Sequence, residues 1–207
     1  MSSSNPLARQ TRTAFLVLLA SIVLCSSASA QNLLANGEFD TDLAPWTLFN
    51  QEFIEMSWTS GDVDGSLTSG SLETYSQSGG PYQCVPVSGN SEYFLDGYVA
   101  PLSLDRAGTV NHTLAVEWFS SSNCSFGTAL SFESLPAATT LDTFERLSGS
   151  IVAPLSANSA RVWLYATNSG GFARALYDSV YLPEPGFGMS IVLAVGALGG
   201  LARCRRR

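Results

Sequence analysis

The chain has 207 residues, with 17 acidic residues, 10 basic residues and a formal net charge of −7. All 17 carboxylates lie between Glu38 and Glu184, where they face only four arginines and no lysine, a net charge of −13. Such a surface repels phosphate backbones and anionic lipids, which argues against nucleic acid as a partner. It suits cations, neutral glycans or simple solubility outside the cell.

Residues 1–30 have the pattern of a secretory signal peptide. Arg9 and Arg12 precede the apolar stretch 14–24, and the small residues 28–30 form a cleavage site. We therefore expect cleavage after Ala30 and a fold that begins at residue 31.

Residues 31–182 are predicted to form one domain of β-strands. Apolar residues recur with a period of two in short segments, which are separated by Gly, Ser, Pro, Asn and Asp. The predicted strands are 93–100, 109–119, 144–152, 160–167 and 175–182, with shorter candidates at 53–58 and 83–87. The stretch 66–80 is rich in serine and glycine and is predicted to be a mobile connection. Many short strands at this spacing predict an all-β, antiparallel β-sandwich.

The four cysteines are expected in different compartments. Cys25 lies in the signal peptide and Cys204 among the arginines of the tail, which leaves Cys84 and Cys124 together in an oxidising space. We expect a disulfide between them, worth roughly 4 kcal/mol in the chain-entropy model. A metal site is the weaker alternative, because two thiolates with no nearby histidine do not make a zinc set.

The tail, residues 183–207, has three parts. Pro183-Glu184-Pro185 is followed by the apolar run 186–202 and then by four arginines, Arg203, Arg205, Arg206 and Arg207. As a helix the apolar run would be roughly 26 Å long, just enough to cross a thin bilayer, with the arginines on the cytoplasmic side. An ordinary single-pass anchor with a stiff proline-rich linker would have the same features.

The order of these three parts, together with the signal peptide, resembles the PEP-CTERM sorting signal of Gram-negative bacteria. The resemblance covers about 25 residues of the tail. It implies that the helix holds the chain transiently in the inner membrane. It also implies that an exosortase-type membrane protease cuts near Pro183-Glu184-Pro185 and passes the protein to the cell surface or matrix.

Four motifs are spaced along the predicted domain. They are the opening 32–40 followed by Trp46, the middle 69–72, the strand 93–95 and the closing 175–182. The set is similar to cellulose- and xylan-binding modules of the galactose-binding-like superfamily, and the similarity covers nearly the whole domain. It implies a jelly-roll β-sandwich that binds carbohydrate without cutting it.

That resemblance also implies a structural calcium where the first and last strands meet. The matching residues are Asp40, with Glu38 as a nearby option, and Asp178; carboxylate oxygens suit this hard cation. The alternative is that Asp40 and Asp178 accept hydrogen bonds from backbone amides. The segment 62–65 also has two carboxylates but lacks the rest of a calcium loop, and it is predicted to be a hairpin turn.

Alternation along the strands assigns side chains to two faces. One set is predicted to be core: Tyr93, Leu95, Val99, Leu114, Val116, Trp118, Val162 and Leu164. The opposite set mixes rings and carboxylates: Asp96, Tyr98, Glu117, Trp163 and Tyr165. Sugars stack their C–H faces on aromatic rings and hydrogen-bond to carboxylates, so we expect these five residues to share one open, glycan-binding sheet face. The alternative is that the rings lie under loops or form a second core layer.

Catalysis has little support in the sequence. His112 is the only histidine, and a lone histidine on an amphipathic strand is typical of a surface or satisfied residue. No Gly-x-Ser-x-Gly elbow occurs, and Asp96 and Glu117 could act as a hydrolytic pair only across a cleft. We therefore predict a secreted, non-catalytic protein that binds extracellular polysaccharide. The alternatives are a structural or adhesive matrix protein without sugar binding and, more distantly, a glycoside-active enzyme.

Overall fold

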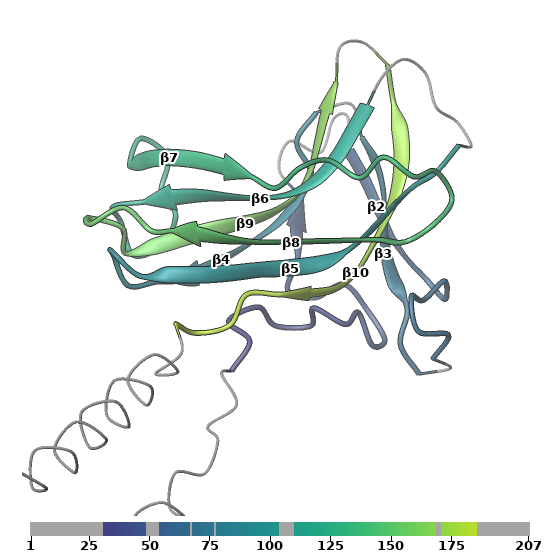
Figure 1. Ribbon diagram of the computed structural model, residues 1–207, viewed down its shortest axis with the longest axis horizontal. Helices are drawn as coiled ribbons and strands as arrows, with labels where there is room; N and C mark the ends of the chain where they lie inside the picture. The colour runs from purple at the N-terminus through teal and green to yellow at the C-terminus, as the bar shows by residue number, and fades with distance from the viewer. Residues whose placement is uncertain are drawn as a thin grey trace, which may run out of the picture. The chain divides into compact units, whose positions relative to one another are not determined.

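The computed structural model describes residues 31–48, 54–66, 68–76, 78–103, 110–168 and 171–185. In these ranges the chain forms ten strands in two antiparallel, five-stranded sheets, which pack as a β-sandwich (Figure 1). The predicted all-β jelly-roll sandwich is confirmed. The predicted signal peptide, membrane helix and arginine cluster lie outside the described residues. Within the described ranges, no helix has the length and apolar character needed to cross a bilayer.

Each sheet combines strands from distant parts of the chain. The first sheet has the order β1 (Thr47–Leu48), β4 (Pro81–Pro86), β9 (Ser159–Asn168), β6 (Val110–Phe119) and β7 (Ala129–Ser134). The second sheet has the order β2 (Ile54–Thr59), β3 (Ser71–Ser76), β10 (Ala173–Tyr181), β5 (Glu92–Pro101) and β8 (Glu145–Val152). The chain crosses between the sheets after every strand except β2 and β6, so most neighbours in a sheet are far apart in sequence.

The stretch 66–80 is not a mere connection, and that prediction is wrong. It contains β3, which is paired with β2 on one side and with β10 on the other. The side chains of Ser71, Leu72, Thr74 and Ser76 are buried there. Small hydroxyl residues are typical of loops by composition, but in this position they fill a tightly packed part of the sandwich. Strands β1 and β7 were also not predicted.

The predicted core is confirmed. All eight residues of the inward set, from Tyr93 to Leu164, are buried between the sheets, with Phe39, Tyr177 and Leu182 beside them. His112 also points inward and is buried, with its Nδ1 3.1 Å from the hydroxyl of Tyr177. Burial raises the pKa of that tyrosine. The histidine is therefore a core residue whose Nδ1 lies within hydrogen-bond distance of Tyr177.

The two ends of the described chain are paired. Asn32 forms an antiparallel bridge with Pro183, its Oδ1 accepts the Leu182 N–H at 2.9 Å, and the Glu184 N–H donates to the Gln31 carbonyl at 3.0 Å. The opening segment thus runs beside the end of β10 (Figure 1). Two residues of the predicted sorting motif are therefore hydrogen-bonded or bridged to the sandwich.

Candidate functional site

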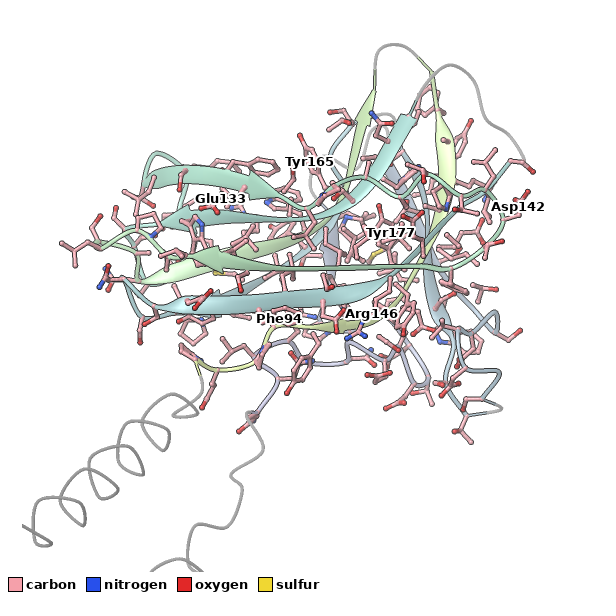
Figure 2. The ribbon with its side chains drawn as sticks, in the orientation of Figure 1. Phe94, Glu133, Asp142, Arg146, Tyr165 and Tyr177 are labelled. Atoms are coloured by element: carbon pink, nitrogen blue, oxygen red, sulfur yellow. A yellow bond between two sulfur atoms is a disulfide. The ribbon has the colours of Figure 1, made fainter. Side chains whose placement is uncertain are left out.

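The five predicted glycan-binding residues do not share one face. Glu117 on β6 and Trp163 and Tyr165 on β9 lie on the outer face of the first sheet, whereas Asp96 and Tyr98 on β5 lie on the outer face of the second. The expectation of a single open face is wrong, because alternation assigns the side of a strand but not the sheet that the strand joins. In Figure 2 the label of Tyr165 lies by β6 and β7, whereas those of Phe94 and Arg146 lie along β5.

A row of four aromatic rings crosses the outer face of the first sheet. The ring centroids lie 4.9 Å apart for Tyr82 and Trp163, 6.1 Å for Trp163 and Tyr165, and 5.0 Å for Tyr165 and Phe132. We call these four residues the aromatic row. Three strands contribute to it: β4, β9 and β7.

Strand register explains how the aromatic row forms. Tyr82 pairs with Trp163, and Trp163 pairs in turn with Ala115 of β6. β6 separates β9 from β7, yet the rings of Tyr165 and Phe132 meet. They can do so because the residue between them on this face of β6 is small: Ala115 is fully buried. The rings of Tyr165 and Phe132 therefore meet above the small side chain of Ala115.

The rings of the row differ in accessibility. Phe132 is 45% exposed, and Tyr82 and Tyr165 are half-buried. Trp163 is only 5% exposed, so the alternative that a ring lies under cover is correct for this residue. It supports its neighbours and offers no bare surface. Tyr82 and Phe132 were missed from the sequence, because the strand of Phe132 was not predicted and that of Tyr82 was predicted to begin after it.

Arg161 lies buried beside the row, and nothing in its sequence context indicated this. Its Nη1 donates to Glu117 Oε2 at 3.1 Å and its Nη2 to the Cys124 carbonyl at 2.9 Å. Its Cζ lies within 5.2 Å of four ring centroids, those of Tyr82, Phe119, Phe126 and Trp163. The cation is thus enclosed by π-faces and by charge-assisted hydrogen bonds.

The predicted disulfide between Cys84 and Cys124 is present and lies on this same face. Cys84 pairs with Arg161 in the sheet, and Cys124 belongs to the loop between β6 and β7. The Cys124 N–H also donates to the Ser159 hydroxyl at 2.9 Å. The bridge therefore holds this loop, with the exposed ring of Phe126, over one end of the sheet face.

The outer face of the second sheet is more polar. Asp96 accepts two hydrogen bonds from Arg146, from Nε at 2.9 Å and from Nη2 at 2.6 Å. The hydrogen bond to Asp96 and its negative charge raise the pKa of the guanidinium. Tyr98 pairs with Arg146 across the strands, and Phe94 is 44% exposed nearby on β5. Asp96 is thus engaged by an arginine.

Asp96 and Glu117 do not form a hydrolytic pair. They lie on the outer faces of different sheets. Two carboxylates that cleave a glycosidic bond must flank it at roughly 5 to 9.5 Å from each other. These two therefore cannot act on the same bond.

The predicted calcium ligands are not brought together as a set. Asp178 is buried, and its oxygens accept the N–H groups of Val63 at 2.9 Å and Ser179 at 2.6 Å. Glu38 accepts the Ser179 hydroxyl at 2.9 Å, and Asp40 is exposed. In the ranges that the structure covers, no three His, Cys, Asp or Glu side chains are arranged to hold a metal ion. The geometry supports the amide-bonding alternative for Asp178, and calcium binding stays a prediction.

Asp178 has an altered acidity. Burial raises the pKa of its carboxyl from 3.8 to about 6, and the charges of Asp62 and Glu38 act in the same direction. The two backbone N–H groups oppose the rise. The loop that carries Val63 forms the turn predicted at 62–65: Asp62 accepts the Asp64 N–H at 2.8 Å, and Gly65 has φ of 72°.

A search with the sequence finds no matching protein family and no matching curated protein. Solved structures do match. One is the Clostridium thermocellum endo-1,4-beta-D-xylanase 10B fragment with CBM22-1 and GH10 modules, complexed with xylohexaose. It has a TM-score of 0.55 and 14% sequence identity, and the match covers 76% of this chain and 29% of that chain. Another is the CBM22-1 xylan-binding domain of Paenibacillus barcinonensis Xyn10C. It has a TM-score of 0.53 and 16% sequence identity, and the match covers 77% of this chain and 98% of that chain. A third is the enzymatically active domain of a Bacteriophage CBA120 tailspike protein. It has a TM-score of 0.52 and 14% sequence identity, and the match covers 73% of this chain and 21% of that chain.

These likenesses show a shared fold. The chain spans less than a third of the xylanase fragment and of the tailspike chain, but nearly all of the isolated xylan-binding domain. Because a binding domain and an enzymatically active domain are both among the matches, the shared fold does not determine the function. The chain has the sandwich fold of xylan-binding modules, with an aromatic row on the outer face of one sheet.

Proposed function

We propose that the sandwich binds polysaccharide without cutting it, through the aromatic row on the outer face of the first sheet. The observation that carries this proposal is the row itself: four rings from three strands, with neighbouring centroids 4.9 to 6.1 Å apart. A row along a sheet face suits an extended sugar chain, whose C–H faces stack on the accessible rings of Tyr82, Tyr165 and Phe132.

The surroundings of the row favour a neutral glycan. Glu117 borders it, and its side chain is 23% exposed, so one carboxylate can accept hydrogen bonds from sugar hydroxyls. The acidic surface of the domain disfavours polyanionic chains. Trp163 and Arg161 pack beneath and beside the accessible rings. They hold these rings in place before any ligand arrives, which lowers the entropic cost of binding.

The fold is consistent with this proposal. The isolated domains that this chain matches over nearly their whole length are described as xylan-binding. A neutral, xylan-like polysaccharide or the cell's own exopolysaccharide is therefore the ligand class we propose. Non-catalytic binding is favoured because Asp96 and Glu117 lie on different sheets.

The test compares two phenylalanines of matched exposure on opposite faces. Phe132 is 45% exposed on the first sheet, and Phe94 is 44% exposed on the second. Phe132→Ala and Tyr165→Ala should each weaken retention in affinity electrophoresis through soluble xylan by about tenfold, since an aromatic contact is worth about 1 kcal/mol beyond its area. Phe94→Ala should leave retention unchanged. Equal losses for Phe94→Ala and Phe132→Ala would contradict the assignment of the face.

A structural role in a matrix is the second candidate, and β7 favours it. This strand pairs only with β6 in the described chain, and Leu130 and Phe132 on it are exposed. Exposed apolar edge strands recruit further strands. A second copy of the chain would then add to this edge, and Leu130→Lys would convert the oligomer to a monomer in sedimentation velocity. A wild-type protein that stays monomeric at all concentrations rules this candidate out.

We further propose that the chain is secreted, sorted by an exosortase-type protease and delivered to the surface or matrix. The disulfide supports an oxidising compartment. Mass spectrometry of the surface product should give an N-terminus at Gln31 and a C-terminus near Pro185. A product that keeps residues 186–207 would instead indicate a permanent anchor.

A further inference from the structure

A concave site lies away from the aromatic row, between the opening segment and the loop that joins β2 to β3. Its volume is about 530 Å³, within the range of small-molecule sites. It is lined by one aromatic ring, one carboxylate and several hydroxyls: Trp58, Asp40, Ser60, Ser66, Thr68 and Ser69. No ring of the aromatic row lines it.

Trp58 differs from the other tryptophans of the chain. Trp46, Trp118 and Trp163 are all buried, whereas Trp58 is 39% exposed at the edge of the second sheet. A large aromatic ring left in contact with water costs hydrophobic free energy unless something covers it. Its place in a pocket wall makes this ring accessible to a ligand.

The ring of Trp58 is held rigidly. Its Nε1–H donates to the Phe39 carbonyl at 2.7 Å. One edge rests on Gly70, where a Cβ would lie 2.7 Å from Cε2 and Cζ2 of the ring. Only glycine allows this approach. A ligand that stacks on the exposed surface of Trp58 therefore meets a surface that needs little further ordering.

The polar groups of the pocket lie beside this ring. Asp40 directly follows Phe39, whose carbonyl anchors the ring, and within the described residues the Asp40 carboxylate accepts no hydrogen bond. The Ser66 and Thr68 hydroxyls lie 3.1 Å apart, and the Ser69 hydroxyl donates to Asp62. The Ser66 oxygen already accepts the N–H groups of Thr68 and Ser69. A hydroxyl oxygen has two lone pairs, so the Thr68 and Ser69 oxygens still have acceptor capacity for a ligand.

We propose that this pocket binds a short neutral saccharide, such as the end of a glycan chain. The sugar stacks on Trp58, its hydroxyls donate to Asp40, and the serine and threonine hydroxyls complete the hydrogen bonding. A quaternary ammonium ion is the other ligand of aromatic and acidic sites, but such cations are held by cages of several rings. Here one ring and several hydroxyls match a polyhydroxylated ligand. The pocket and the row would bind different parts of one polysaccharide.

The experiment uses acrylamide quenching of tryptophan fluorescence in the purified full-length protein. Because Trp58 is the exposed tryptophan, the quenchable fraction should belong to it and should disappear in Trp58→Phe. The probes are xylose, glucose, galactose, mannose, N-acetylglucosamine and xylohexaose, each at millimolar concentration, with choline as a competing cation. At least one sugar should reduce quenching of the wild type at least twofold.

The variants separate this pocket from the aromatic row. Asp40→Asn should keep the quenchable fraction and weaken sugar protection about tenfold, whereas Glu55→Gln, an exposed carboxylate elsewhere on β2, should change neither. Phe132→Ala should leave protection intact although it weakens retention on xylan. The proposal is overturned if none of the six sugars protects Trp58, if only choline does, or if Asp40→Asn and Glu55→Gln behave alike.

Discussion

The two outer faces of the sandwich carry the same kinds of residue but use them differently. Each combines aromatic rings and carboxylates with arginine: Arg161 on the first sheet, and Arg146 and the half-buried Arg174 on the second. On the first sheet the side chain of Arg161 is 5% exposed and enclosed by rings, whereas on the second the side chain of Arg146 is 57% exposed and bonded only through its head group to Asp96. The same chemistry is therefore part of a packed layer on one face and part of a solvated surface on the other.

The cause of the difference is what covers each face. The loop between β6 and β7 folds back over the first sheet and is tied there by the disulfide, so Arg161 is buried beneath Phe126. On the second sheet the loop that carries Val63 lies near Asp178 and Leu176, and Arg146 on the edge strand β8 stays open. The loop over the first sheet therefore explains why the rings of that face are held in place.

The largest expected effect on stability comes from removing the disulfide that ties the loop between β6 and β7 to the first face. Cys84→Ser combined with Cys124→Ser frees a loop with a sequence separation of 40 residues. The free energy of unfolding in urea should fall by roughly 4 kcal/mol, because the unfolded chain regains the entropy of that loop. Wild-type protein in reducing buffer should show the same loss. A loss below about 1 kcal/mol would mean that the bridge is not what holds this face together.

Arg161→Ala should have the next largest effect. The change leaves the Cys124 carbonyl and Glu117 without their donor and opens a gap among four rings. Breaking a buried, hydrogen-bonded charge pair costs about 3 kcal/mol. Urea unfolding measures this directly. If Arg161→Ala unfolds at the same urea concentration as Arg146→Ala, the proposed contrast between the two faces is wrong.

Asp178 is the buried carboxyl of the second face, and it makes stability depend on pH. Its pKa is raised to about 6, so the folded state holds the proton more tightly than the unfolded chain does. This contribution is fully present below pH 3.8 and is lost as the pH rises through 6, a full difference of about 3 kcal/mol, of which roughly half is present at pH 5. The wild type should therefore gain stability between pH 7.5 and pH 5 relative to Asp178→Asn. If the free energy of unfolding depends on pH in the same way for the two proteins, this prediction is wrong.

The smallest effect is expected for the open ion pair of the second face. Asp96→Asn and Arg146→Ala should leave the urea midpoint within experimental error, because exposed pairs are screened by water and salt. The midpoint difference from the wild type should not change between low and high salt. A clear loss of stability that disappears at high salt would show that this ion pair is screened by water less than its exposure indicates.

Local patterns predicted much of this structure. The alternation of β5, β6 and β9 correctly assigned the inward residues, because burial of one sheet face leaves a period of two in the sequence. It failed at β3, where Ser71, Thr74 and Ser76 are polar yet buried, and at β7, where five of six residues are exposed and leave no alternation. Trp58, the ring of the proposed pocket, lay in a predicted strand, but nothing local indicated that its ring is exposed.

The sequence by itself determined the inward face of the long strands, the turn at 62–65 and the pairing of Cys84 with Cys124, because each leaves a mark within a few residues or follows from the compartment. Only the tertiary structure decided that β5 and β9 join different sheets, that Trp163 is covered and Tyr165 is not, and that Arg161 is enclosed. These outcomes depend on strand pairing and loop packing between segments far apart in the chain, and such long-range contacts have no local periodicity from which to predict them.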